Sequence, residues 1–334
     1  MGIAQDDHLY SDGTVNIANG AGTVETGVME MGIGVPQSGS WATPDRQARF
    51  VARAEELGYA TAWTFQRLLY PPDGDRTWSP VYRAALDPMV TLGYVAAHTS
   101  RIRLGVALLN MPFASPALVA KQATTVDVLS GGRLDLGLGL GWRQEEFAAS
   151  GVPMARRGAR ADEFIAALKT LFTDDVAEFH GEFYEIPASI QEPHPVQRPH
   201  PPLILGAKST PALRRAGRLG DGWVSSSNQD LTRIADDIAT VRASAREAGR
   251  DPSALRFVCR GVVRAGEPIV KDGERRRLTG DYDQIRGDLK WLGEQGITEV
   301  FVDANFIRDI GNPHVDADTA TAKAEELLTE LAPR

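Results

Sequence analysis

Short apolar runs alternate with segments of helical periodicity along the chain from residue 31 onward. Eight runs have the length and apolar content of buried strands. They cover residues 31–35, 61–65, 101–109, 133–140, 201–207, 222–227, 255–263 and 297–303. After each run, apolar residues recur at the spacing of one helix face. We therefore expect eight helices. Seven of them cover residues 43–58, 87–97, 115–129, 161–172, 211–219, 282–292 and 316–331, and the helix after the sixth strand ends at residue 247.

Local signals mark several of these helix ends. Thr43, Asp87 and Ser115 each stand directly before a proline. An oxygen-bearing side chain at the N-cap accepts a hydrogen bond from the first turn, and proline is favoured at the first helical position. Gly58 follows the first helix, where glycine suits the left-handed C-cap conformation. These signals indicate that the alternation of strands and helices is real.

Strands that alternate with helices predict an α/β protein with a parallel sheet. Eight such units favour a (β/α)8 TIM barrel with insertions at its C-terminal face. The alternative is an open, doubly wound sheet, but no change of composition marks a second domain. We expect one barrel domain over residues 29–334. The connections 144–160 and 179–201 exceed ordinary loops, and the proline-rich part of the second should be extended and exposed.

Residues 1–28 break this pattern. They are rich in Gly, Asp, Asn and Thr and show no sustained period. Such a segment buries little apolar surface, so we expect a flexible N-terminal extension outside the fold.

Composition excludes several classes of protein. The formal net charge of −8 disfavours a nucleic-acid or anionic-membrane partner. The single cysteine, Cys259, fits a reducing compartment, and no apolar run reaches the length of about 20 residues that spans a bilayer. We expect a cytoplasmic protein. The six histidines lack the spacing of metal ligands on one element, so we expect no metal site.

One segment is specific enough to indicate a family. Residues 87–142 contain Asp-Pro, Ala-Ala-His-Thr, Arg-Ile-Arg-Leu-Gly, Ala-Lys-Gln-Ala-Thr-Thr-Val-Asp-Val-Leu-Ser-Gly-Gly-Arg and Gly-Leu-Gly-Leu-Gly-Trp, in that order. This segment closely resembles the central signature of the bacterial luciferase-like monooxygenase family, and the likeness extends over about residues 31–330. The resemblance implies a flavin- or deazaflavin-dependent oxidoreductase with coenzyme F420 or FMN as cofactor. It also implies a small-molecule substrate, a flavin or F420 reductase as a partner, and a homodimer.

The start of the helix after the fifth strand is the candidate phosphate site. Gly206, Ala207, Lys208, Ser209 and Thr210 combine a hydroxyl N-cap with a lysine. Free N–H groups and the positive end of the helix dipole attract anions there. In the family this loop holds the cofactor phosphate. Two further arginines, Arg157 and Arg160, are candidates to reach the same phosphate, although a solvated charged surface explains them nearly as well.

Two strand ends are candidates to hold the cofactor ring. In the family, a non-proline cis peptide near the end of the third strand supports the ring, and by position it is the bond between Ala107 and Leu108. Glycines at alternate positions end the fourth strand, outside the turn into a helix that a Rossmann motif requires. Glycine permits close approach of a ring or of backbone. We assign cofactor contact to the residues Gly139, Leu140, Gly141 and Trp142.

The candidate catalytic residues are Gln66, Arg67 and Asn110. Many relatives have Asp-His just after the second strand, where this chain reads Gln66-Arg67. Arginine stays protonated, so Arg67 is no proton shuttle near neutral pH. It can instead bind an anionic substrate or a ring carbonyl.

Three functions follow from the resemblance. We favour hydride transfer by F420, because the third strand and the Gly-Leu-Gly-Leu-Gly-Trp run look more like that branch. The alternative is an FMN monooxygenase, which uses reduced flavin from a partner reductase and oxygen. A barrel that binds the cofactor without catalysis is the alternative of another class. A phosphate-binding aldolase or isomerase is disfavoured, because no strand end carries an evident Schiff-base lysine or carboxylate base, although Lys208 keeps this class open.

Overall fold

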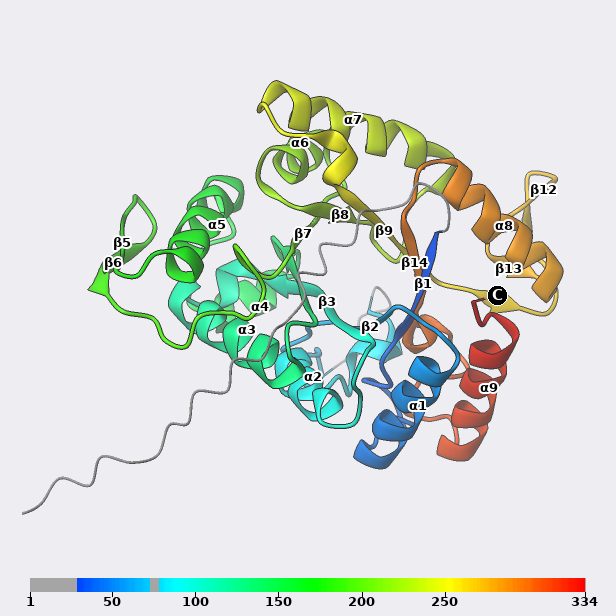
Figure 1. Ribbon diagram of the computed structural model, residues 1–334. Helices are drawn as coiled ribbons and strands as arrows, with labels where there is room; N and C mark the ends of the chain where they lie inside the picture. Colours follow the sequence, from blue (N-terminus) through cyan, green and yellow to red (C-terminus); the bar gives the residue numbers. More distant parts are fainter. Residues whose placement is uncertain (1–28, 73–77, 334) are drawn as a thin grey trace, which may run out of the picture.

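Eight parallel strands form a closed barrel in the order β1-β14-β9-β8-β7-β4-β3-β2 (Figure 1). The computed structural model describes residues 29–72 and 78–333, so the predicted extension 1–28 lies outside the described residues. The barrel strands are β1 (Glu30–Gly34), β2 (Thr61–Thr64), β3 (Arg103–Asn110), β4 (Leu134–Gly139), β7 (Leu203–Gly206), β8 (Gly222–Val224), β9 (Arg256–Gly261) and β14 (Glu299–Val302). The closed order confirms the predicted barrel and excludes the open sheet.

Helices surround this barrel. They are α1 (Pro44–Glu56), α2 (Pro88–Ala96), α3 (Pro116–Ser130), α4 (Gln144–Ala149), α5 (Arg157–Thr173), α6 (Thr210–Leu219), α7 (Ile234–Glu247), α8 (Tyr282–Glu294) and α9 (Ala317–Glu330). The side chains of Thr43, Asp87 and Ser115 accept capping hydrogen bonds, as their positions predicted. The sequence missed α4, and α5 begins about one turn before residue 161, where we expected it.

Short extra strands decorate the barrel. β5 (Ala177–His180) and β6 (Glu185–Ser189) form an antiparallel hairpin, which projects beside α5 (Figure 1). After β9, β10 (Arg264–Ala265) pairs with β13 (Thr279–Gly280), and β11 (Val270–Lys271) pairs with β12 (Glu274–Arg275). The short 3-10 helices are η1 (Pro80–Tyr82), η2 (Met111–Phe113), η3 (Leu231–Arg233), η4 (Pro252–Ala254) and η5 (Ala304–Phe306).

The prediction that the proline-rich segment is exposed was wrong in part. Pro195 and Pro201 are buried. Gln197 packs back onto the barrel, where its Nε2 donates to Asp127 Oδ1 at 2.7 Å and to the Leu134 carbonyl at 2.7 Å. Composition alone could not show this, because the amide partners lie on α3 and β4, far away in the sequence.

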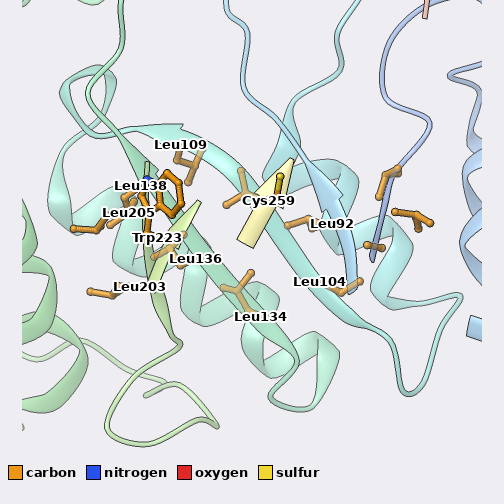
Figure 2. Packing of buried hydrophobic residues seen from close by; sticks show 14 of the residues in the cluster. Leu92, Leu104, Leu109, Leu134, Leu136, Leu138, Leu203, Leu205, Trp223 and Cys259 are labelled. Carbon is orange, nitrogen blue, oxygen red and sulfur yellow. The ribbon is translucent and has the colours of Figure 1, made fainter. Parts of the chain in front are cut away.

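Alternation along the strands divides the apolar core into two parts. On β4, the side chains of Leu134, Leu136 and Leu138 belong to the large cluster between the strands and the helices (Figure 2). A smaller cluster fills the inside of the barrel. It consists of Trp63, Ala107, Ile204, Val224, Val258 and Phe301, with the half-buried Leu108 packed against it. The barrel is therefore a filled core and not a pore.

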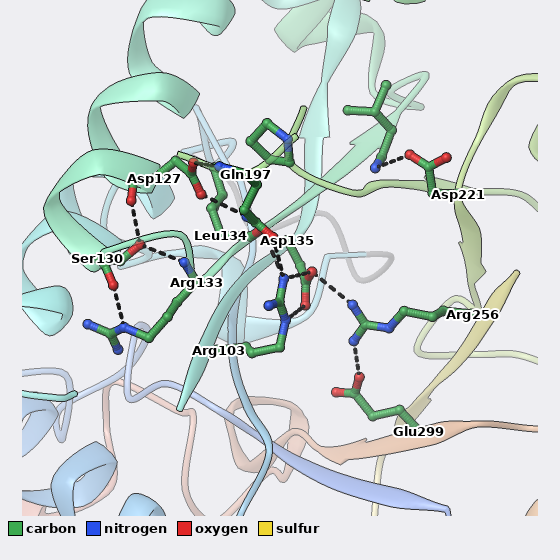
Figure 3. A network of polar contacts seen from close by, with 12 residues as sticks. Arg103, Asp127, Ser130, Arg133, Leu134, Asp135, Gln197, Asp221, Arg256 and Glu299 are labelled. Carbon is green, nitrogen blue, oxygen red and sulfur yellow. Dashed lines mark hydrogen bonds and ion pairs between the residues drawn. The ribbon is translucent and has the colours of Figure 1, made fainter. Parts of the chain in front are cut away.

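A charged layer closes the N-terminal end of the barrel (Figure 3). Asp135 pairs with Arg103 and, across the barrel, with Arg256 at 2.8 Å. Arg256 also contacts Glu299 at 2.8 Å, and Glu299 accepts a hydrogen bond from the Trp63 indole at 2.7 Å. Both carboxylates are fully buried. Burial alone lowers the pKa of Arg256, but the two carboxylates hold that pKa above its ordinary value.

The helices of residues 29–72 and 78–333 carry no candidate membrane span. None of them combines the length and the apolar character that a membrane crossing requires.

Candidate functional site

Strand β3 ends in a bulge at the C-terminal mouth of the barrel. Its register against β4 shifts between Val106 and Leu109, and the peptide bond between Ala107 and Leu108 is cis. The predicted position of this bond is therefore confirmed. Leu108 is half-buried and packs on the apolar barrel interior. The bulge presents an apolar, partly accessible surface at the mouth.

Glycines on the neighbouring strands leave room for this bulge. A Cβ atom on Gly137 would lie 1.9 Å from the Val106 carbonyl oxygen, and one on Gly206 would lie 2.0 Å from Leu108 Cδ1. A Cβ atom on Gly139 would lie 3.0 Å from the same Leu108 atom. Close packing of the bulge thus accounts for these glycines. Direct contact of Gly139 with a cofactor stays a prediction.

The chain turns sharply after β4. Gly141 has a φ of 70°, and a Cβ atom there would lie 2.9 Å from the Phe113 ring. The neighbouring Leu140 is half-buried, and Trp142 is half exposed, with its ring 6.2 Å from that of Trp78. The predicted contact residues therefore lie at the mouth, where the half-exposed Trp142 ring carries the Arg143 guanidinium at 3.9 Å from its centroid.

The segment 206–210 joins β7 to α6, as the phosphate-site prediction requires. Ser209 is the N-cap, but its side chain makes no capping hydrogen bond, in contrast to the N-caps of α1, α2 and α3. Lys208 is exposed, with Nζ 3.4 Å from Asn228 Oδ1. The Ala207 carbonyl accepts a hydrogen bond from the buried Trp223 indole at 2.9 Å, which fixes the loop. An uncapped helix start beside a lysine can hold an anion.

The two predicted arginines of α5 differ in their surroundings. Arg157 is half-buried at the start of the helix, and the next residue, Gly158, accepts a hydrogen bond from Arg215 of α6 at 3.0 Å. Arg160 donates to the Pro153 carbonyl at 2.9 Å, and its guanidinium lies 5.0 Å from the Phe183 ring. These contacts direct Arg160 toward the β5–β6 hairpin and away from segment 206–210.

Gln66 and Asn110, two of the candidate catalytic residues, lie in contact. Gln66 Oε1 accepts hydrogen bonds from the Asn110 backbone N–H at 2.9 Å and from its Nδ2 at 3.1 Å. These bonds tie the loop after β2 to the end of β3. Gln66 therefore holds the edge of the bulge in place.

The Arg67 side chain is buried between a carboxylate and several aromatic rings. Its Nη1 lies 3.3 Å from Glu146 Oε2, and the two side chains are 6% and 1% exposed. The guanidinium lies 4.7 Å from the Tyr82 ring and 5.3 Å from the Trp142 ring. Burial lowers the pKa of Arg67, and Glu146 acts in the opposite direction. Glu146 also accepts from the Leu68 N–H at 2.8 Å, so the pair fastens α4 to the loop after β2.

Arg260, at the end of β9, was missed by the sequence analysis. Its Nε donates to Asp303 Oδ2 at 2.8 Å, and its Nη1 donates to the Ala107 carbonyl at 3.3 Å. The guanidinium also lies 4.2 Å from the Phe306 ring. Arg256, Val258 and Arg260 alternate along β9, and this period-two pattern was the available signal that Arg260 points into the barrel.

Across residues 29–72 and 78–333, no three His, Cys, Asp or Glu side chains gather in a way that could hold a metal ion.

Comparison with known proteins adds the following findings. The sequence profile described as luciferase-like monooxygenase matches residues 22–270. An uncharacterised protein of Mycobacterium tuberculosis is 30% identical over 314 residues, which are 91% of this chain and 99% of that protein. The FMNH2-dependent dimethylsulfone monooxygenase of Pseudomonas putida is 37% identical over 164 residues, 48% of this chain and 45% of that enzyme.

Among solved structures, an F420-dependent secondary alcohol dehydrogenase in complex with an F420–acetone adduct is similar. It superposes with a TM-score of 0.72 at 16% identity and covers 91% of this chain and 99% of that chain. At this level of identity the likeness shows the shared fold alone.

Proposed function

This chain belongs to the luciferase-like monooxygenase family, and on that premise we propose that it transfers a hydride between coenzyme F420 and a small organic substrate. As a member of this family it is a flavin- or F420-dependent oxidoreductase. The choice of F420 is supported by the likeness of β3 and of the run that ends in Trp142 to F420-dependent members.

The observation that carries this proposal is the arrangement of two surfaces at the mouth. The half-buried Leu108 on the β3 bulge offers an apolar support for a flat ring. The α6 start, with Lys208 and an N-cap whose side chain leaves the first turn uncapped, offers N–H groups and a positive charge to a phosphate. The residues present therefore fit a phosphate-bearing flavin or deazaflavin.

In this proposal the cofactor supplies the redox chemistry, and the protein supplies orientation and electrostatics. Bound F420 gives or accepts a hydride, whereas reduced FMN with oxygen delivers an oxygen atom. Arg260 places a positive charge beside the bulge, and its position is fixed by Asp303. A fixed cation of this kind stabilises negative charge that develops on a ring or on a substrate oxygen. Arg67, which stays protonated, contributes charge but no proton transfer.

The second candidate is an FMN monooxygenase, and the identity of 37% to an FMNH2-dependent enzyme favours it. Its chemistry differs in the need for oxygen and for a partner that supplies reduced flavin. We also propose that the protein forms a homodimer and that a partner reductase supplies its reduced cofactor.

A fluorescence titration of the purified protein with F420 and, separately, with FMN tests the proposal. We expect saturable micromolar binding of F420 and much weaker binding of FMN. The substitution Lys208→Gln should weaken binding about tenfold, the equivalent of one charge-assisted hydrogen bond. The exposed Lys290 of α8 provides the control, because Lys290→Gln makes the same charge change away from the mouth.

The outcomes separate the candidates. Tight binding of FMN with oxygen uptake in its reduced form would establish the monooxygenase. Binding of F420 without hydride exchange with any alcohol, aldehyde or alkene tested would favour the non-catalytic barrel. If neither cofactor binds, the proposed function is wrong.

A further inference from the structure

A cavity of about 840 Å³ lies beside the mouth, between the loop after β8 and the segment 262–278 that follows β9. β12 of this segment contacts α8 through the ion pair of Arg275 with Asp288, and β13, which follows the segment, lies next to α8 (Figure 1). Cavities of about 300–1,000 Å³ hold small organic ligands. Arg260 lines the cavity and also donates to the Ala107 carbonyl at the bulge, so the cavity adjoins the point where we place the cofactor ring.

The lining of this cavity is basic, although the protein as a whole is acidic. Five cationic side chains line it, namely Arg260, Lys271, Arg275, Arg276 and Arg277. Three carboxylates also line it, namely Asp230, Asp272 and Glu274. The net charge of the lining is therefore opposite in sign to the net charge of −8 of the chain.

The ion-pair partners of three of these arginines stand behind the wall. Arg275 and Arg277 both pair with Asp288 on α8, at 2.8 and 3.0 Å, and Arg260 pairs with Asp303. Asp288 and Asp303 are buried and do not line the cavity. These partners thus fix in position three arginines that line the cavity.

Two of the cations differ from these three. The exposed side chains of Lys271 and Arg276 form no ion pair with any residue in the part of the chain that the structure describes. Their charges are available to a ligand.

The carboxylates of the lining either accept hydrogen bonds from neighbouring residues or lie exposed at the edge of the cavity. Asp230 accepts hydrogen bonds from the Thr232 backbone N–H at 3.1 Å and from the Thr232 hydroxyl at 2.7 Å. The bond from the hydroxyl, followed by that from the backbone, lowers the pKa of Asp230. Asp272 and Glu274 are exposed at the turn between β11 and β12. Neither removes the excess of positive charge on the wall.

We propose that this cavity binds the substrate through an anionic group, a phosphate or a carboxylate, held by Lys271 and Arg276 with Arg260 at the inner end. The inference rests on the proposed function, because it places a substrate beside the ring. Lys208, which we assign to the cofactor phosphate, does not line this cavity. Lys208 contacts Asn228, which accepts a hydrogen bond from the lining residue Ser226, so the proposed substrate site and the cofactor phosphate site are neighbours with different cations.

The test is calorimetric titration with inorganic phosphate and, in a second arm, with succinate. It uses the protein both free and saturated with whichever cofactor it binds. We expect binding of at least one anion in the saturated protein, and a dissociation constant at least tenfold higher in the double variant Lys271→Gln/Arg276→Gln. The arm that gives the tighter binding identifies the phosphate or carboxylate class.

A matched control separates local from overall charge effects. Arg246 and Lys290 are exposed on α7 and α8 and do not line the cavity, and Arg246→Gln/Lys290→Gln changes the net charge by the same amount. Equal anion binding in the two double variants would overturn the proposal. So would the absence of anion binding, or its complete loss on saturation with cofactor, which would assign the cavity to the cofactor itself.

Cofactor affinity, followed by fluorescence, is an independent readout. We expect the double variant Lys271→Gln/Arg276→Gln to bind the cofactor as the unmodified protein does. If no cofactor binds to any form, the proposed function fails, while the anion titration of the free protein still decides whether the cavity is an anion site.

Discussion

Gly137 shows how a single methyl group decides whether the barrel mouth can form. The substitution Gly137→Ala places a Cβ atom 1.9 Å from a backbone oxygen of β3, which cannot rotate away. We expect a loss of about 1–3 kcal/mol in the free energy of unfolding, the usual cost of overpacking a core. Urea unfolding measures it.

A control glycine lies in α8. Gly287 has no atom within 4 Å of its constructed Cβ, so Gly287→Ala should stabilise the helix by about 0.5–1 kcal/mol. If both variants unfold at the midpoint of the unmodified protein, close packing is not the reason for glycine at position 137.

Single residues could be predicted from the sequence where the signal is local or comes from the family resemblance, but long-range side-chain contacts could not. The position of the cis bond between Ala107 and Leu108 followed from the family resemblance and is confirmed. The pairing of Arg67 with Glu146 could not be predicted, because it depends on α4 folding over the mouth. Arg260 was missed for a similar reason, since its partner Asp303 lies just after the neighbouring barrel strand β14.

At the level of elements, the β5–β6 hairpin carries a pH-sensitive contact. His180 Nε2 lies 3.0 Å from Glu178 Oε1, and its Nδ1 lies 2.5 Å from Glu185 Oε1 on the facing strand. The hydrogen bond to Glu178, followed by that to Glu185, raises the pKa of His180 above 6.5. A raised pKa means that the contact stabilises the hairpin fully below pH 6.5 and is lost as the pH rises through the raised value.

We therefore expect the His180 ring to titrate above pH 6.5 in an NMR experiment. The amide signals of residues 177–189 should shift with the same midpoint, because protonation holds the two strands together. The variant His180→Gln should abolish that shift of the amide signals. Titration of His180 at or below 6.5 would contradict the bridging role.

Strands and helices differed in how readily they could be predicted. Each predicted barrel strand is present, because buried parallel strands are continuous apolar runs. Helix starts with Thr43, Asp87 and Ser115 were also correct, since capping is a local interaction. α4 and the extra short strands were missed, because elements of two to six residues are too short to show a period.

For the molecule as a whole, the charged layer at the N-terminal end joins strands from opposite sides of the barrel. The substitution Arg256→Met leaves the buried Glu299 without its cationic partner. Removal of one member of a buried ion pair costs about 3–5 kcal/mol, so we expect a loss of stability of that order. Arg246→Met on α7 is the control, because Arg246 is exposed.

The loss should depend on pH in a definite direction. Burial already raises the pKa of Glu299, although Arg256 opposes this. A carboxyl with a raised pKa favours the folded state most below its ordinary pKa and progressively less as the pH rises. Urea unfolding should therefore show a larger deficit at pH 8 than at pH 5 for Arg256→Met. A deficit that is equal at both pH values would contradict the role assigned to Arg256.

The filled interior and its charged layer also constrain the order of events during turnover. Within the described residues 29–72 and 78–333, Trp63 and Phe301 pack across the middle of the barrel and block the way to its opposite end. Everything that enters the mouth must leave by the same way. A cofactor seated against the bulge would be enclosed by a substrate that arrives after it. Such a dead-end chamber favours an ordered sequence, in which the cofactor binds first and departs last.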